Sequence, residues 1–254
     1  MQGIFGCSGE FYDMNIFADS NHRALPKGYR HELKYQIDTL QLYALQNQLP
    51  DLMALDPSVG NANSYRIRSI YFDDYCNSCY YQNENGTEPR EKFRIRIYNG
   101  SDEMIRLELK KKSHSMTQKH SCRISKELAL SMISGGPIPW SSSMDPLLQK
   151  FYIQQETRLL QPKIIVEYDR IPFVAPDGNV RVTLDLNICA STDFDRFFCS
   201  DLGSRPIMPP DLHLLEVKYN QFLPDYIYRS FQSKQLMHTT YSKYYLCRKY
   251  GVLI

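Results

Sequence analysis

Residues 91–112 read EKFRIRIYNGSDEMIRLELKKK, and this stretch decides the fold. Successive side chains of a β-strand point to opposite faces of the sheet. Charged residues therefore fall on one face of two strands joined by a turn at Asn99 and Gly100, and apolar residues fall on the other face. The charged face carries Lys92, Arg94, Arg96, Arg106, Glu108 and Lys110. The stretch predicts an antiparallel hairpin with one apolar face and one cationic face.

The same alternation recurs along the chain. A single hairpin of this kind commonly keeps its charges in water and only its apolar face against a core. Recurrence favours a different arrangement, because further segments also alternate polar and apolar residues between turn signals. These segments are residues 28–38, 65–73, 117–125, 162–173, 180–188 and 213–220. Together with the hairpin they predict about eight strands, largely antiparallel.

The two-faced strands could form either a flat sheet or a closed barrel, which differ in where they place the charged face. A flat sheet would expose its charged face to water, whereas a closed sheet turns alternate residues into its interior. Helical spacing and capping residues predict helices that would cover the apolar outer faces. These helices follow residue 38 and span about residues 125–133, 145–160, 224–236 and 240–250. We therefore predict an α+β fold: an eight-stranded antiparallel β-barrel tunnel with a polar, cationic interior, flanked by helices.

Several basic residues would share the interior of such a barrel. They are Lys34, Arg94, Arg96, Lys110, Lys119, Arg123, Arg170, Arg181 and Lys218. Unpaired like charges repel strongly at reduced dielectric, so this interior predicts a polyanionic ligand. Phosphate chains suit it, because guanidinium groups bind phosphate oxygens bidentately and lysines add point charge. The interleaved Glu32, Glu108 and Glu216 could hold a divalent metal that bridges phosphates, or could only neutralise neighbouring bases.

Composition excludes several other classes of protein. The 254 residues carry 30 basic and 28 acidic side chains, a net charge of +2, which argues against a nucleic-acid-coating surface. No apolar run approaches the roughly 20 residues needed to cross a bilayer, and the N-terminus lacks the pattern of a secretory signal. The seven scattered cysteines favour reduced thiols and a cytoplasmic location. Residues 1–25 are predicted to be a loosely attached extension, and residues 26–254 the folded domain.

A set of ordered motifs resembles a known family. The motifs are YRHELKYQID, YRIRSIYFD, EKFRIRIYN, LELKKK, EYDR followed by RVTLD, and LLEVKYN. In this order they resemble the VTC-domain family of polyphosphate polymerases, within the triphosphate tunnel metalloenzyme superfamily, over about residues 29–245. The resemblance implies an eight-stranded antiparallel tunnel that binds a nucleoside triphosphate and polyphosphate with Mn²⁺ or Mg²⁺.

The resemblance also implies roles for particular residues. Basic tunnel residues of the family match Lys34, Arg94, Arg96, Lys110, Arg170 and Arg181, with Lys119 and Lys243 as further matches. The metal-binding glutamate of the family resembles Glu216, with Lys218 beside it; Glu32 and Glu108 are further metal candidates. Arg30 departs from the wider superfamily, which usually has a glutamate there, and this weakens an interpretation as a simple triphosphatase or adenylate cyclase.

The function expected from the resemblance is metal-dependent transfer of the γ-phosphate of ATP onto a growing polyphosphate chain. Positioning and charge neutralisation dominate such chemistry, and Arg94, Arg96, Lys110, Arg170 and Arg181 are the residues expected to supply them. Two alternatives remain open: hydrolysis of tripolyphosphate in the same tunnel, and a non-catalytic module that binds or senses polyphosphate. The expected partners are ATP and inorganic polyphosphate or triphosphate, with no nucleic acid, and any membrane coupling would need a separate partner.

Overall fold

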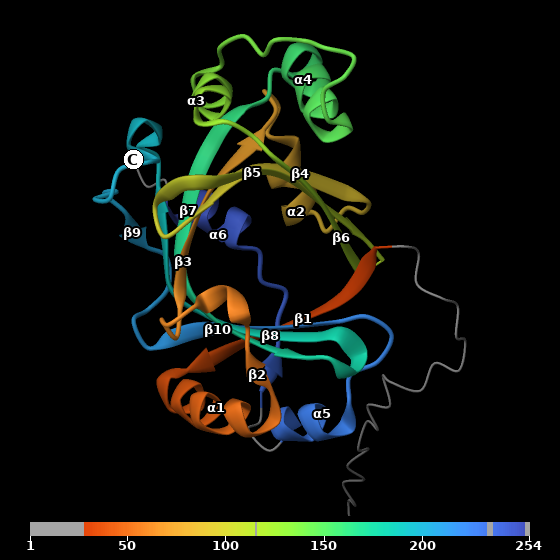
Figure 1. The fold of residues 1–254 in the computed structure, drawn as a ribbon, viewed down its shortest axis with the longest axis vertical. Coiled ribbons are helices and arrows are strands. Elements are labelled where there is room, and N and C mark those ends of the chain that lie inside the picture. Colours follow the sequence, from red (N-terminus) through yellow and green to blue (C-terminus); the bar gives the residue numbers. More distant parts are fainter. Residues whose placement is uncertain (1–27, 115, 233–235, 252–254) are drawn as a thin grey trace, which may run out of the picture.

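The computed structural model describes residues 28–114, 116–232 and 236–251. Eight strands form a closed antiparallel barrel, seen as a ring in Figure 1, in which each strand pairs with the next and β8 pairs back to β7. In barrel order they are β7 (Gln161–Ala175), β3 (Tyr65–Asp73), β4 (Arg90–Tyr98), β5 (Ser101–Ser113), β6 (Met116–Arg123), β1 (Tyr29–Asp38), β10 (Leu212–Tyr219) and β8 (Val180–Ser191). The predicted eight-stranded barrel is confirmed. The extension predicted over residues 1–25 lies outside the described residues.

The hairpin of β4 and β5 has the predicted turn and the predicted faces. Asn99 and Gly100 have φ angles of 52° and 70°, the left-handed pair that a tight hairpin turn requires. In the register of the two strands, Arg94 lies opposite Glu108 and Phe93 lies opposite Leu109. Paired residues of antiparallel strands point to the same face, so one face of the hairpin is charged and the other is apolar.

Four helices cover the apolar outer faces of the barrel, as predicted (Figure 1). The helices α3 (Lys126–Ser134) and α4 (Pro146–Arg158) pack with the outward residues of β4 and β5 in a core that includes Phe93, Leu107 and Phe151. The helices α1 (Thr39–Leu52) and α5 (Asp225–Gln232) pack in a second core with the outward residues of β1, β8 and β10. Side chains cap three of these helices, from Asp38 for α1, Ser125 for α3 and Asp145 for α4.

The remaining two α-helices of the described residues pack differently, and the prediction that a helix over residues 240–250 covers an outer face was wrong. Helix α6 (Lys243–Tyr250) contacts β7, β8 and α2 (Ser78–Glu84), and it appears within the outline of the barrel in Figure 1. A third core joins Tyr244 and Cys247 of α6 to inward residues of β3 and β7, such as Tyr71 and Tyr168. The barrel interior is therefore aromatic and apolar along β3 and much of β7, and the predicted cationic surface lies on the other strands and at Arg170 of β7.

Short elements complete the described fold. Three two-residue strands extend the sheet: β2 (Ala54–Leu55) on β7, β9 (Arg205–Pro206) on β8 and β11 (Met237–His238) on β1. Three 3₁₀ turns span Pro57–Val59, Asp177–Asn179 and Phe194–Arg196. Within the described ranges, no helix combines the length and apolarity that crossing a membrane would take.

Candidate polyanion site inside the barrel

Glu108 on β5 is the centre of the first group of interior charges. Its carboxylate lies 2.6 Å from Nη2 of Arg94, 3.7 Å from Nη1 of Arg96 and 3.1 Å from Nζ of Lys119. Burial alone would raise the pKa of Glu108, but these three cations hold that pKa far below its usual range. Glu108 is therefore ionised, and its charge only partly offsets the bases around it.

Glu32 on β1 is the centre of a second group. Lys110 donates to both of its oxygens, at 2.9 and 2.8 Å, and Lys34 lies 2.9 Å away. Burial opposes ionisation of Glu32, yet Lys110 and Lys34 hold its pKa well below the usual range. The pKa of Lys110 itself is lowered to about 7, because burial and the neighbouring Lys34 and Lys218 outweigh the attraction of Glu32.

Glu216 and Asp185 form a third group with two buried carboxylates. Arg170 donates to both oxygens of Asp185, at 2.6 and 2.7 Å, and reaches Glu216 at 3.3 Å. The ammonium of Lys243 lies between the two acids, 2.5 Å from Oδ2 of Asp185 and 2.8 Å from Oε1 of Glu216. Lys218 lies 3.0 Å from the other oxygen of Glu216. Burial would raise the pKa of both acids, but the surrounding cations lower it.

Tyr168 on β7 connects the first and third groups. Its hydroxyl accepts a hydrogen bond from Arg96 at 3.4 Å. Its ring lies 5.2 Å from the guanidinium of Arg170 and 4.7 Å from the ammonium of Lys243, both cation–π distances. The predicted bases that the structure brings into contact with the interior carboxylates are Lys34, Arg94, Arg96, Lys110, Lys119, Arg170, Lys218 and Lys243.

Two predicted bases lie apart from these groups. Arg181 pairs with Asp56 at 2.8 Å and donates to the hydroxyl of Tyr65 at 3.1 Å. Arg123 donates to the backbone carbonyl of Glu103 at 2.7 Å, at an exposed position. Neither side chain contacts Glu32, Glu108, Asp185 or Glu216 among the described contacts, so both lie toward the periphery of the site.

The interior also contains charged residues that sequence reasoning left without a role. Asp185 shares a strand face with Arg181, so alternation places it inside, but alternation does not show that it pairs with Arg170 and Lys243. Lys92 shares a face with Arg94 in the same way. Its ammonium donates to Asn83 at 2.8 Å and to Ser242 at 3.4 Å, and it lies 4.7 Å from the ring of Tyr244.

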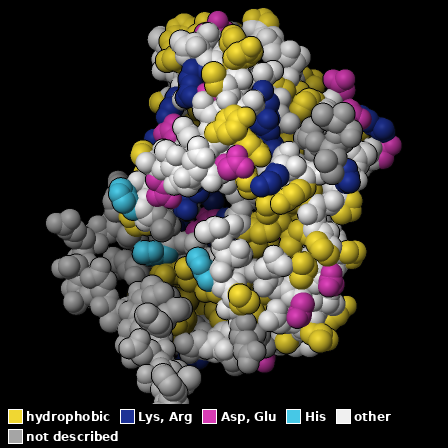
Figure 2. All heavy atoms as spheres, turned by 180° about the vertical axis from the view of Figure 1, so that it is seen from behind, with side chains coloured by type: hydrophobic (Ala, Val, Ile, Leu, Met, Phe, Trp, Pro, Cys, Tyr) yellow, Lys and Arg dark blue, Asp and Glu magenta, His cyan; other side chains and the backbone are white. Residues whose placement is uncertain are grey.

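The balance of charge inside the barrel is strongly positive. Lys92 and the eight bases in contact with the interior carboxylates make nine basic groups around four acids, which are Glu32, Glu108, Asp185 and Glu216. Figure 2 shows basic side chains recessed in a hollow on the side opposite to that of Figure 1, beside acidic side chains. Such an excess of basic over acidic groups in the interior favours the binding of a polyanion.

Comparison with known proteins identifies the family. The model of the VTC domain matches residues 29–251. This chain belongs to the VTC domain family. A comparison with curated proteins gives no match.

Solved structures resemble this VTC domain in fold at low sequence identity. A putative adenylyl cyclase from Hippeastrum, described as having a dominant triphosphatase activity, is 12% identical with a TM-score of 0.51, over 89% of this chain and 97% of that one. A putative adenylate cyclase from Bacillus halodurans is 12% identical with a TM-score of 0.45, over 82% of this chain and 89% of that one. At this identity, the first similarity supports the barrel fold alone.

The donor set of the VTC domain fits a divalent cation only in part. The ammonium of Lys243 shows that a cation can lie between Asp185 and Glu216. Hard divalent cations such as Mg²⁺ take six oxygen ligands, commonly from a few carboxylates, phosphates and water. No cluster of three or more acidic, histidine or cysteine side chains in the described residues could hold a metal. A metal at Asp185 and Glu216 would therefore need phosphate and water oxygens as its remaining ligands.

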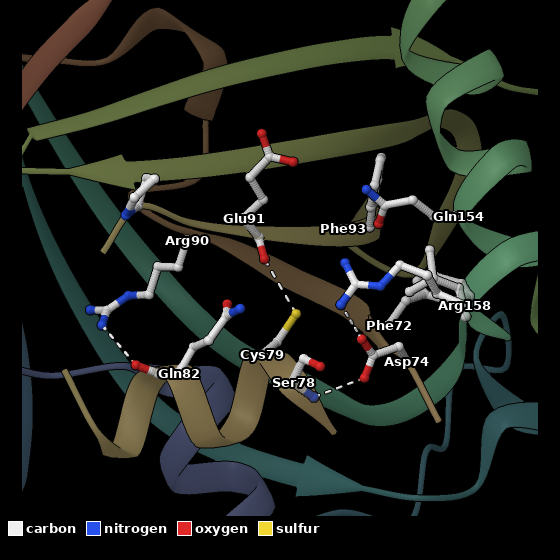
Figure 3. A pocket seen from close by; sticks show the side chains of 12 residues that line it. Phe72, Asp74, Ser78, Cys79, Gln82, Arg90, Glu91, Phe93, Gln154 and Arg158 are labelled. Carbon is white, nitrogen blue, oxygen red and sulfur yellow. Dashed lines mark hydrogen bonds and ion pairs between the residues drawn. The ribbon is translucent and has the colours of Figure 1, made fainter. Parts of the chain in front are cut away.

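A separate pocket of about 140 Å³ lies outside the barrel, between α2, β4 and α4 (Figure 3). In it, Asp74 pairs with Arg158, and the thiol of Cys79 donates to the backbone carbonyl of Glu91 at 3.3 Å. Arg90 turns toward the carbonyl of Gln82. These polar groups have partners within the protein, so the pocket is a weaker candidate for anion binding than the barrel interior.

Proposed function

We propose that this VTC domain is a metal-dependent polyphosphate polymerase, which transfers the γ-phosphoryl group of ATP onto a growing polyphosphate chain inside the barrel. One observation carries the proposal: nine basic groups surround four carboxylates in the interior. A chain of phosphates supplies many negative charges along a line, which a single carboxylate or phosphate ligand cannot do.

The bases of the site account for the chemistry. Phosphoryl transfer requires in-line positioning and stabilisation of charge on the transferred oxygens, with little covalent catalysis by the protein. Arg94, Arg96 and Arg170 present guanidinium groups held by buried carboxylates, so that their positions are fixed before the substrate binds. Lys110 is proposed to act with them, and Arg181 to bind phosphate at the periphery. The terminal phosphate of the acceptor chain is the nucleophile, so no protein nucleophile is required.

The proposed metal is Mn²⁺ or Mg²⁺, bound at Glu216 with Asp185 beside it. When bound, such an ion would neutralise negative charge on the phosphates and help to orient them. Glu108 is a weaker candidate as a metal ligand because it contacts only bases. Glu32 is weaker because Lys34, the lysine that it shares with Glu216, lies 3.9 Å from the Glu216 carboxylate. We place the protein in the cytoplasm, with any membrane coupling through a separate partner.

Hydrolysis is the second candidate function. The similar Hippeastrum protein is described as a triphosphatase, and the same barrel would cleave tripolyphosphate if water took the place of the acceptor. A module that only binds polyphosphate would retain the cationic interior without turnover.

Product analysis distinguishes these functions. Purified protein incubated with ATP and Mn²⁺ is expected to form long polyphosphate, resolved from free phosphate on a gel. Arg94→Ala should reduce this synthesis at least about tenfold, because it removes a charge-assisted phosphate contact. Arg66→Ala is the matched control, since Arg66 lies on the outer face of β3 and pairs with Asp169 at the surface. Free phosphate without polymer would indicate a hydrolase, and no turnover would indicate a binding module.

A further inference from the structure

Lys92 differs from the eight bases that contact the interior carboxylates in that it has no acidic partner among the described contacts. Each of the eight predicted bases in the site contacts a carboxylate. Lys92 has only neutral partners in the described residues: the amide of Asn83, the hydroxyl of Ser242 and the ring of Tyr244. These groups solvate an ammonium but do not neutralise its charge.

The groups that face Lys92 from neighbouring elements do not supply a negative charge either. Burial raises the pKa of the Cys79 thiol on α2 and of the Tyr244 phenol on α6, so both are neutral near pH 7. On β3, Asp73 accepts from the Tyr244 hydroxyl at 2.5 Å and lies 3.2 Å from Arg248. The charged groups on the strands that act on Lys92 most strongly, Arg90, Lys110 and Lys34, are all basic and repel its ammonium.

The register of the strands places Lys92 in a row of three lysines. Lys92 on β4 lies opposite Lys110 on β5, which lies opposite Lys119 on β6. The next row along the barrel contains Arg94 and Glu108. Like charges directly opposite on neighbouring strands are destabilising. This row of lysines therefore destabilises the ligand-free fold by charge repulsion, and a bound anion would remove that repulsion.

From this geometry we propose that Lys92 is an additional phosphate-binding residue, which with Lys110 and Lys119 forms a subsite for the polyphosphate chain next to the arginines of the site. Lys92 is partly exposed, so a ligand can reach it. A phosphate oxygen would supply the anionic partner that Lys92 lacks among the described residues. This inference rests on the proposed binding of a phosphate polyanion in the barrel and is independent of turnover.

Proton uptake gives the subsite a distinctive signature. Burial, with the nearby Arg90 and Lys110, lowers the pKa of Lys92 to about 7, so a fraction of this side chain is neutral in the ligand-free protein. Binding a phosphate favours the charged form. Lys92 should therefore take up part of a proton when the ligand binds near pH 7.5.

The test uses equilibrium binding of inorganic tripolyphosphate to the whole protein, without metal. Calorimetry at pH 7.5 in two buffers with different ionisation enthalpies gives the affinity and the number of protons taken up. Lys92→Met should weaken binding about ten- to a hundredfold and reduce proton uptake. Lys92→Arg should bind with nearly the affinity of the wild type but with reduced proton uptake, since arginine stays charged.

Lys119→Met is the matched control. Lys119 belongs to the same row but already has a carboxylate partner in Glu108, so its loss should weaken binding less than the loss of Lys92 does. If Lys92→Met and Lys92→Arg both bind tripolyphosphate as the wild type does, the assignment of Lys92 to a phosphate subsite is wrong. If Lys92→Met does not fold, unchanged proton uptake in Lys92→Arg overturns the proposal by itself. If the wild-type protein does not bind tripolyphosphate at all, the proposed function fails first.

Discussion

At the scale of single residues, Glu216 and Glu108 are both buried carboxylates among cations, but their surroundings differ. Glu108 contacts only bases, each of which belongs to a strand of the barrel. Glu216 shares the ammonium of Lys243 with a second acid, Asp185. A divalent ion binds more tightly where two carboxylates can both contact it. We therefore expect Glu216 to be the better metal ligand of the two, and Glu108 to neutralise the bases around it.

This difference predicts opposite outcomes for two matched substitutions. Glu216→Gln should lower metal-dependent turnover at least about a hundredfold, because the metal loses its charged ligand. Metal-free binding of tripolyphosphate should stay the same or tighten, since the interior becomes more positive. Glu108→Gln, the control, should leave the Mn²⁺ concentration for half-maximal activity unchanged. Full activity of the Glu216→Gln protein at limiting Mn²⁺ would assign the metal to another residue.

Most interior bases could be predicted from the sequence because strand geometry has a period of two. Once Arg94 is inside, Arg96 and Lys92 must be inside as well. The period does not predict which charges meet across the barrel, because that depends on strand register and on the positions of the helices. The pairing of Asp185 with Lys243 spans β8 and α6, and the lack of an acid near Lys92 depends on α2 and α6.

At the scale of elements, the strands were predictable and the position of α6 was not. Each strand carries its own two-sided pattern, so its orientation in the barrel follows from its sequence. A helical period shows that α6 has an apolar side, but it does not show which surface that side covers. In the structure, that side packs against inward residues of β3 and β7, where the strands present Tyr71 and Tyr168.

The packing of α6 predicts that its aromatic residues are structural. Tyr244 is 2% exposed, its ring centre lies 5.3 Å from that of Tyr71, and its hydroxyl donates to Asp73. Tyr244→Ala should lower the free energy of unfolding by about 3–5 kcal/mol, as for other large aromatic deletions in cores. Tyr244→Phe should cost about 1–2 kcal/mol, because it leaves the buried Asp73 with one donor fewer.

Urea unfolding measures both changes against a surface control. Tyr81 on α2 is 53% exposed, so Tyr81→Ala should change the free energy of unfolding by no more than about 0.5 kcal/mol. Equal effects of Tyr244→Ala and Tyr81→Ala would mean that α6 does not belong to the cooperative unit of the barrel.

At the scale of the whole molecule, the excess of interior cations opposes folding in the absence of ligand. A ligand that binds only the folded state stabilises it by RT ln(1 + [L]/Kd), or about 2.7 kcal/mol at a hundredfold excess over Kd. Tripolyphosphate should therefore raise the melting temperature, and by less at 0.5 M salt than at low salt. Equimolar chloride or acetate is the control. A melt that tripolyphosphate does not change at low salt would contradict a polyanion site.

The same excess of cations predicts how stability depends on pH. The pKa of Lys92 and of Lys110 is lowered to about 7 in the folded protein, mainly by burial. Between pH 7 and the ordinary lysine range, the unfolded chain thus binds more protons than the folded one, and the free energy of unfolding rises with pH. From pH 6 to 9 the rise should be about 2 kcal/mol for each lysine. Urea unfolding across this range measures it.

Lys92→Met should remove roughly half of the slope. Saturating tripolyphosphate should remove most of it, because bound phosphate keeps both lysines charged. An equally steep rise in the Lys92→Met protein would place the origin of the pH dependence elsewhere.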